Sequence, residues 1–283
     1  MAGSKTYADY LDLHTLLSLQ GNDSELSNDE QHFIIVHQAF ELWFRLVLIE
    51  LKSARTLLMQ SILPEEDVPR VVHHLKRCTE IFRLMTNQWK VMETMTPQDF
   101  LAFREGLGTA SGFESYQMRE LELLLGLQQN QRVGEMDPLG HFRKLAEKGG
   151  EDAEVLKRLE AEEAMPTMGE ILSKWLARTP IQGSLISSDN DDEIVAGFVG
   201  DYLSAHKKIG DDTVERMAAH GVNNMAVVEE RFAAAHSAAK EFLIPDGEIS
   251  RARAGLLFIE SYRELPLLTW PRILIDTLVE LEE

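Results

Sequence analysis

The chain has 283 residues, 44% of them hydrophobic, which is enough to bury the core of one large domain or two small ones. Its formal net charge of −19 argues against nucleic acid and anionic membrane as partners, because both bind basic patches. Charges interrupt every apolar run well short of the roughly 20 residues that a membrane span needs, and the N-terminus lacks an apolar signal segment. We therefore expect a cytoplasmic protein. Its single cysteine, Cys78, argues against an internal disulfide and is expected to be a small buried residue.

Helical periodicity runs through nearly the whole chain, whereas alternating β-type patterns are hard to find. We expect an all-α fold, a helical bundle that forms one domain over residues 1–283. The first helix is expected over Thr6–Leu19, within an N-terminal arm of residues 1–20. One side of this helix carries Tyr7, Tyr10 and Leu11. The arm is therefore expected to pack on its own chain or on a neighbouring one.

The most apolar segment, His32–Leu51, is hydrophobic almost all the way round, which predicts a helix that is buried on every side. Polar residues in such a helix are informative, because a buried polar group costs roughly 1–3 kcal/mol unless a partner satisfies it. Phe33, His37 and Glu41 lie one helical turn apart and so share a stripe. His37 is therefore either a satisfied core histidine or a reactive group.

Residues 64–94 predict a long amphipathic helix that pairs antiparallel with that apolar helix. Thr96 and Pro97 then signal a new helix start, as N-cap and first helical residue. This helix places Phe100 and Arg104 on one face. A guanidinium binds a carboxylate in bidentate fashion, so Arg104 is a candidate anchor for an aromatic amino acid, with a surface salt bridge as the alternative.

The rest of the chain carries fewer signals. A turn over Gly106–Gly112 permits close backbone approach to a ligand, and the charged residues 128–163 are interpreted as a variable insertion. The nine histidines show no short metal-ligand spacing, and no nucleotide-binding motif is present, so a protein-built zinc site and nucleotide cofactors are not expected. Further helices are expected over residues 113–127, 167–179, 193–209, 212–219, 223–242, 249–262 and 270–281.

Two segments carry a specific resemblance. Phe33–Trp43 and Thr94–Arg104 are similar to the distal-pocket region of heme-dependent tryptophan 2,3-dioxygenases. The resemblance continues in order along nearly the full chain, through Tyr7–Leu11, Ser111–Ser115 with Arg119, Trp175–Pro180, and Ser261–Pro266.

This resemblance implies a heme b cofactor and the insertion of both atoms of dioxygen across the C2–C3 bond of the indole ring of L-tryptophan. The product would be N-formylkynurenine, in tryptophan catabolism by the kynurenine pathway. His37 would be the catalytic distal histidine that hydrogen-bonds the indole nitrogen, and Arg104 would pair with the substrate carboxylate. The other implied positions are Phe33 and Phe100 around the substrate ring, Tyr7, Tyr10 and Leu11 in a neighbouring subunit's pocket of a homotetramer, and Ser111, Gly112 and Trp89 at the heme.

One part of the family pattern has no counterpart. The proximal histidine of the family lies beyond the block that corresponds to Leu278–Glu283, so the residue that would bind the iron is unknown here. Three interpretations stay open. The sequence is a truncated form, or a histidine such as His206, His220 or His236 binds the iron instead, or the chain binds no heme. Two other functions remain alternatives: a heme-dependent hydroxylase of an aromatic amino acid in a natural-product pathway, and a heme-free protein that binds an aromatic ligand.

Overall fold

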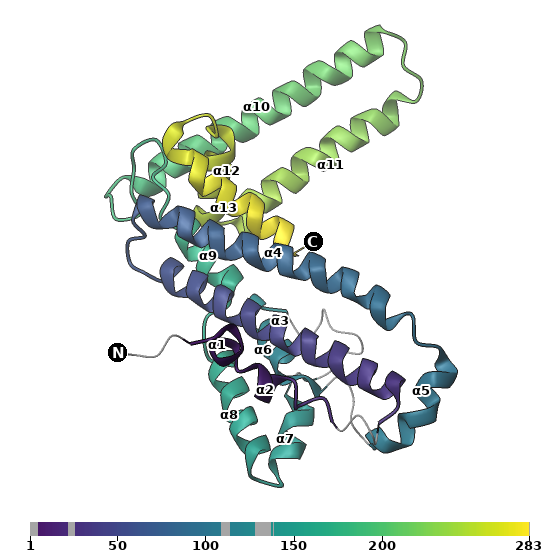
Figure 1. Ribbon diagram of the computed structural model, residues 1–283. Coiled ribbons are helices and arrows are strands. Elements are labelled where there is room, and N and C mark those ends of the chain that lie inside the picture. The colour runs from purple at the N-terminus through teal and green to yellow at the C-terminus, as the bar shows by residue number, and fades with distance from the viewer. Residues whose placement is uncertain (1–4, 22–25, 109–113, 128–136, 138, 283) are drawn as a thin grey trace. The chain divides into compact units, whose positions relative to one another are not determined.

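The computed structural model describes residues 5–21, 26–108, 114–127, 137 and 139–282 (Figure 1). In these residues the regular structure is helical, and a single isolated bridge is the sole β-type pairing. The predicted all-α fold is confirmed. Within the same residues, no helix is both long enough and apolar enough to cross a membrane.

The chain divides into two compact units. The first comprises residues 1–54, 70–167 and 277–283, and the second comprises residues 55–69 and 168–276. The expectation of one domain stays a prediction.

The helices that lie wholly or mostly in the first unit come before residue 167. Their bounds are α1 Tyr7–Leu11, α2 Leu13–Leu16, α3 Asn28–Leu58, α4 Val68–Met92, α5 Pro97–Phe103, η2 Arg104–Leu107, α6 Tyr116–Leu125, α7 Gly140–Ala146 and α8 Glu151–Glu163. The helices of the second unit are η1 Glu65–Asp67, α9 Met168–Ala177, α10 Asp191–Ala219, α11 Met225–Leu243, η6 Pro245–Gly247, α12 Arg251–Ser261 and most of α13 Pro266–Glu282.

Helices α3 and α4 pair antiparallel, as predicted. Near the start of α3, the Val36 carbonyl accepts a hydrogen bond of 3.1 Å from the Gln88 side chain near the end of α4. Further along α3, the Val47 carbonyl oxygen lies 3.9 Å from the Sγ atom of Cys78. Cys78 is fully buried, also as predicted, and burial raises the pKa of its thiol to about 12.

The prediction that α3 is buried on every side is wrong. Val47 and Leu51 are fully buried, but Ile35, Leu42 and Ile49 are half-exposed. These three exposed residues recur every seven positions and so form one stripe along the helix. Apolar composition shows which face favours burial, but a neighbouring segment must cover that face. In the described residues, one stripe of α3 lacks such cover.

The continuity of the helices differs from the predictions at two places. The first predicted helix is split at Asp12, whose left-handed backbone (φ 50°) separates α1 from α2. In contrast, the two helices expected over residues 193–219 form one continuous helix, α10. Gly210 lies inside α10 against the ring of Phe232 in α11, and this close packing offsets the low helix propensity of glycine.

The core of the second unit is built by two helix pairs. Helix α10 lies beside α11 (Figure 1), and α9 packs on α12. Arg251 at the start of α12 donates to the Asp191 carboxylate (2.9 Å) and to the Thr179 carbonyl (2.9 Å), which joins α12 to the residues that follow α9 and to the start of α10. The main apolar cluster consists of Ile181, Val195, Phe198, Val199, Leu243 and Ala254.

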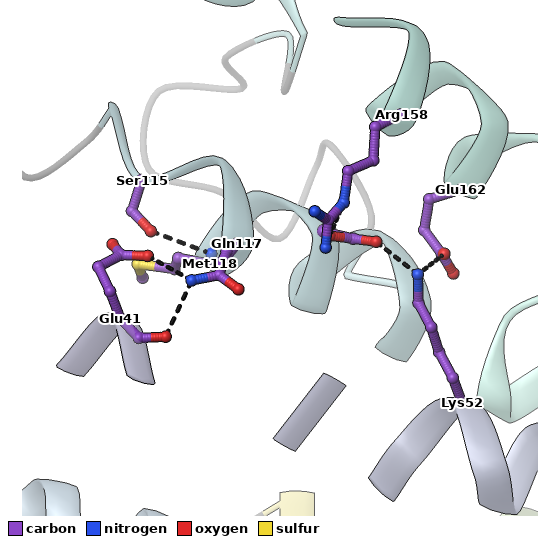
Figure 2. Close-up of polar contacts among 8 residues, drawn as sticks. Glu41, Lys52, Ser115, Gln117, Met118, Arg158 and Glu162 are labelled. Carbon is purple, nitrogen blue, oxygen red and sulfur yellow. Dashed lines mark hydrogen bonds and ion pairs between the residues drawn. The ribbon is translucent and has the colours of Figure 1, made fainter. Parts of the chain in front are cut away.

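The interpretation of residues 128–163 as a variable insertion remains a prediction, but its described part belongs to the core of the first unit. Leu139, Phe142 and Leu159 form a buried cluster with residues of α6. Beside it, the fully buried carboxylate of Glu120 accepts hydrogen bonds from Lys52 of α3 (2.5 Å) and from Nε of Arg158 in α8 (2.8 Å). Figure 2 shows this network, which connects α3, α6 and α8.

Candidate active site

Helix α5 begins where local sequence predicts. The Thr96 hydroxyl accepts a hydrogen bond from the Asp99 backbone N–H, and the Asp99 carboxylate accepts one of 2.9 Å from the Thr96 backbone N–H. Hydrogen bonds from the Thr96 hydroxyl and from its backbone N–H lower the pKa of Asp99. Pro97 occupies the first turn, as predicted. The position of this helix start determines on which face of α5 Phe100 and Phe103 lie.

Three phenylalanine rings from α3 and α5 form a cluster. The ring centroid of Phe33 lies 5.9 Å from that of Phe100 and 5.6 Å from that of Phe103, and the last two are 5.5 Å apart. The spacing of Phe33 and Phe100 is in the range of favourable aromatic contact. Phe103, which is buried, was not predicted as a site residue. Its position three residues after Phe100 on the same helix is the sequence signal that indicates it.

His37 extends this cluster along α3. Its ring centroid lies 4.0 Å from that of Phe33, so the predicted stripe brings the two side chains into contact. The Nδ1 atom of His37 lies 2.8 Å from the Phe33 carbonyl oxygen. Because a carbonyl only accepts hydrogen bonds, Nδ1 is the donor in this contact, and the tautomer that it selects has its lone pair on Nε2. His37 can thus accept a hydrogen bond through Nε2 beside an apolar surface.

Glu41, the third member of the stripe, has a different role. The side-chain amide of Gln117 in α6 donates to both the carboxylate and the backbone carbonyl of Glu41, each at 2.8 Å (Figure 2). Gln117 is buried, and the Ser115 hydroxyl caps the helix that carries it. Glu41 therefore connects α3 to α6, a contact that the sequence does not indicate.

Arg104 follows the last residue of α5 directly and begins η2. One terminal nitrogen of its guanidinium donates to the Gly108 carbonyl at 3.0 Å. A guanidinium has five N–H groups, so this bond orients the side chain and, as far as the described residues go, leaves further donors for a carboxylate. Arg104 is half-buried and directly follows Phe103, and its backbone N–H donates to the Phe100 carbonyl, so its backbone lies beside the aromatic cluster.

The other predicted site residues lie elsewhere. Trp89 of α4 contacts Phe40 at a centroid distance of 5.1 Å and is half-exposed. On α1, Tyr7 and Tyr10 are each 76% exposed and Leu11 is 42% exposed. Ser111 and Gly112, predicted at the heme, lie outside the described residues. The structure therefore brings together Phe33, His37 and Phe100, and Arg104 follows on the chain directly after α5.

Comparison with known proteins gives a consistent result. A family model described as tryptophan 2,3-dioxygenase matches residues 1–283. The tryptophan 2,3-dioxygenase of Sorangium cellulosum is 37% identical, with 98% of this chain and 70% of that protein covered. Tryptophan 2,3-dioxygenase 2 of Ralstonia nicotianae is 38% identical (98% and 79% covered), and the mouse enzyme is 32% identical (99% and 69% covered). With a match of this length and these identities, the chain belongs to the tryptophan 2,3-dioxygenase family.

Proposed function

We propose that this protein cleaves the indole ring of L-tryptophan with dioxygen to give N-formylkynurenine, as a step of tryptophan catabolism by the kynurenine pathway. The observation that carries the proposal is the contact of His37 with Phe33, in a cluster that also holds Phe100, with Arg104 four residues after Phe100 in the chain. These residue types match an aromatic amino acid: rings for the indole, an acceptor for its N–H group, and a cation for its carboxylate.

The cofactor proposed for this reaction is heme b. The described residues fit the oxygen-binding side of a heme, because the three phenylalanine rings offer an apolar surface and His37 adds one polar atom there. Among the described residues, His37 is the one histidine whose ring contacts this cluster. No residue is therefore proposed as the axial ligand of the heme iron. When bound, the heme iron supplies the activation of dioxygen.

The chain's own residues bind and orient the substrate. Arg104 is proposed to pair with the carboxylate of tryptophan, while Phe33 and Phe100 hold the indole ring and keep water away. The Nε2 atom of His37 is proposed to accept a hydrogen bond from the indole N–H group, because its Nδ1 proton is already donated to the Phe33 carbonyl. Trp89, Ser111 and Gly112 remain proposed contacts of the heme.

We further propose a homotetramer in which the arm of one subunit completes the site of another. The support is the high exposure of Tyr7 and Tyr10, two large aromatic side chains that an arm packed on its own chain would bury. The cytoplasmic location and the absence of nucleic-acid and membrane partners stay predictions from the sequence.

Product analysis tests the proposed function. The purified chain, reconstituted with hemin, is incubated with L-tryptophan and oxygen, and the product is identified by mass spectrometry. Gain of two oxygen atoms with opening of the ring supports the proposal, whereas gain of one oxygen atom would indicate a hydroxylase. An absent Soret band after reconstitution, together with tryptophan binding, would indicate a heme-free binding protein.

Substitution of Arg104 by alanine should weaken binding of L-tryptophan by roughly tenfold or more, since a charge-assisted hydrogen bond contributes about 1.5–3 kcal/mol. Tryptamine, which lacks the carboxylate, serves as the control ligand and should lose much less affinity. Both dissociation constants can be measured by calorimetry, with Arg104→Lys as a charge-conserving comparison. Equal losses for the two ligands would mean that Arg104 acts by holding the Gly108 turn instead of by pairing with the carboxylate.

Substitution of His37 by alanine should lower turnover on tryptophan by about tenfold, because one hydrogen bond of about 1–1.5 kcal/mol is lost. Heme content, measured from the Soret absorbance per chain, should not change. His73→Ala, an exposed histidine on α4, is the matched control and should retain activity. A loss of heme from the His37 variant would assign His37 to heme binding and contradict its role in orienting the substrate.

A further inference from the structure

Two histidines of the second unit meet across the α10–α11 pair. His206 of α10 and His236 of α11 are separated by 30 positions in the chain, yet their Nδ1 atoms lie 3.4 Å apart. The ring centroids are 5.6 Å apart with an angle of 34° between the planes. Both side chains are half-buried, so they are held by their helices but remain accessible to a small solute.

The distance between the two nitrogens suits shared binding of a metal ion better than a direct hydrogen bond. A hydrogen bond from a ring N–H normally spans 2.7–3.2 Å between heavy atoms, which is shorter than the separation observed here. Zinc binds imidazole nitrogens at about 2.0–2.1 Å in tetrahedral geometry, so two ligands of one ion lie roughly 3.4 Å apart. Ligands on opposite sides of one metal, as in a heme with two axial histidines, would lie roughly 4 Å apart.

The surroundings of the pair favour a cation. A cleft of about 530 Å³ lies between α10 and α11, and both histidines line it. Its lining also includes three carboxylates, from Asp211, Glu215 and Glu229, against one lysine, Lys207. Lys207 is paired with Asp211 at 2.6 Å, so the two remaining carboxylates give the cleft a net negative charge.

Neighbouring side chains pack next to the histidine pair. One turn along α10 from His206 lies Gly210, where an added Cβ would be 3.5 Å from the Phe232 ring. Phe232 in turn lies one turn before His236 on α11. On the other side, the ring of Tyr202 lies 6.1 Å from that of His206. A site whose ligands are held before the ion arrives loses less entropy on binding.

We propose that His206 and His236 form a binding site for a divalent transition-metal ion of the zinc type, bound through the two Nδ1 atoms. Imidazole nitrogen suits zinc, copper and nickel, whereas calcium and magnesium prefer oxygen ligands. Two protein ligands leave the remaining coordination positions to water in the cleft. The ion would join α10 to α11. Its ligands belong to the second unit, whereas the residues proposed for the reaction belong to the first.

Metal titration of the full chain tests this proposal. After treatment with a chelator, the protein is titrated with Zn²⁺ in a calorimeter and with Co²⁺ by visible absorption, which reports tetrahedral coordination by nitrogen. We expect one ion per chain. The variants His206→Ala and His236→Ala should each bind at least tenfold more weakly, because each removes one of two protein ligands.

The matched control is His220→Ala, which removes an exposed histidine near the end of the same helix. The Nδ1 atom of His220 lies 2.7 Å from the Arg216 carbonyl, so this nitrogen is already engaged. His220→Ala should bind Zn²⁺ as tightly as the unmodified chain does. Zn²⁺ should raise the unfolding temperature of these two proteins, but not that of His206→Ala or His236→Ala. Absence of binding, or equal loss in the control, would overturn the proposal, and circular dichroism of each variant excludes misfolding as the cause.

Discussion

Replacing Gly255 with alanine should destabilise the protein by about 3 kcal/mol, at the upper end of the usual cost of overpacking. Gly255 is buried inside α12, where that helix packs on α9. A Cβ atom at this position would lie 2.2 Å from the Leu176 carbonyl oxygen and 3.1 Å from its carbon. Both are backbone atoms, so no side-chain rotation can relieve the clash and the two helices must move apart.

Gly197→Ala provides the control for this prediction. Gly197 also lies in a helix of the second unit, α10, but an added Cβ would meet no atom within 4 Å. This variant should be more stable by about 0.5–1 kcal/mol, because alanine loses less backbone entropy than glycine on forming a helix. Guanidinium unfolding followed by circular dichroism gives both free energies. Equal stability of the two variants would contradict the close approach of α9 and α12.

Glu120→Ala should also cost about 3 kcal/mol, at the lower end of the 3–5 kcal/mol expected when one partner of a buried ion pair is removed. The carboxylate is fully buried and binds Lys52 at 2.5 Å and Arg158 at 2.7 Å. The side chains of Lys52 and Arg158 are 37% and 41% exposed, so water can partly replace the lost carboxylate. Glu120→Gln keeps the shape of the side chain, so its free energy of unfolding should lie between those of the alanine variant and the unmodified protein.

The control for this charge network is Glu154→Ala on α8. Glu154 pairs with Lys157 at 2.7 Å, but the two side chains are 73% and 69% exposed. Exposed ion pairs contribute little, so the change in unfolding free energy should stay within about 0.5 kcal/mol. If Glu120→Ala cost no more than this control, the buried network would not connect α3, α6 and α8 as described.

Local signals in the sequence were sufficient for several parts of the structure. Thr96, Pro97 and Asp99 determine the start of α5, because a capping box involves only residues within one helical turn. The contact of His37 with Phe33 follows from helical periodicity in the same way. These predictions succeed because the interacting groups are neighbours on a single helix.

Tertiary packing decided the rest. The stripe of α3 that stays exposed depends on which segments cover the helix, and the continuity of α10 through Gly210 depends on the ring of Phe232 from another helix. Short metal-ligand spacing in the sequence does not indicate the His206–His236 pair, because its members are 30 residues apart. The hydrogen bonds from Gln117 to Glu41 are likewise formed between helices. Sequence periodicity orients a side chain on its own helix, but the distance to a residue on another helix is set by how the two helices pack.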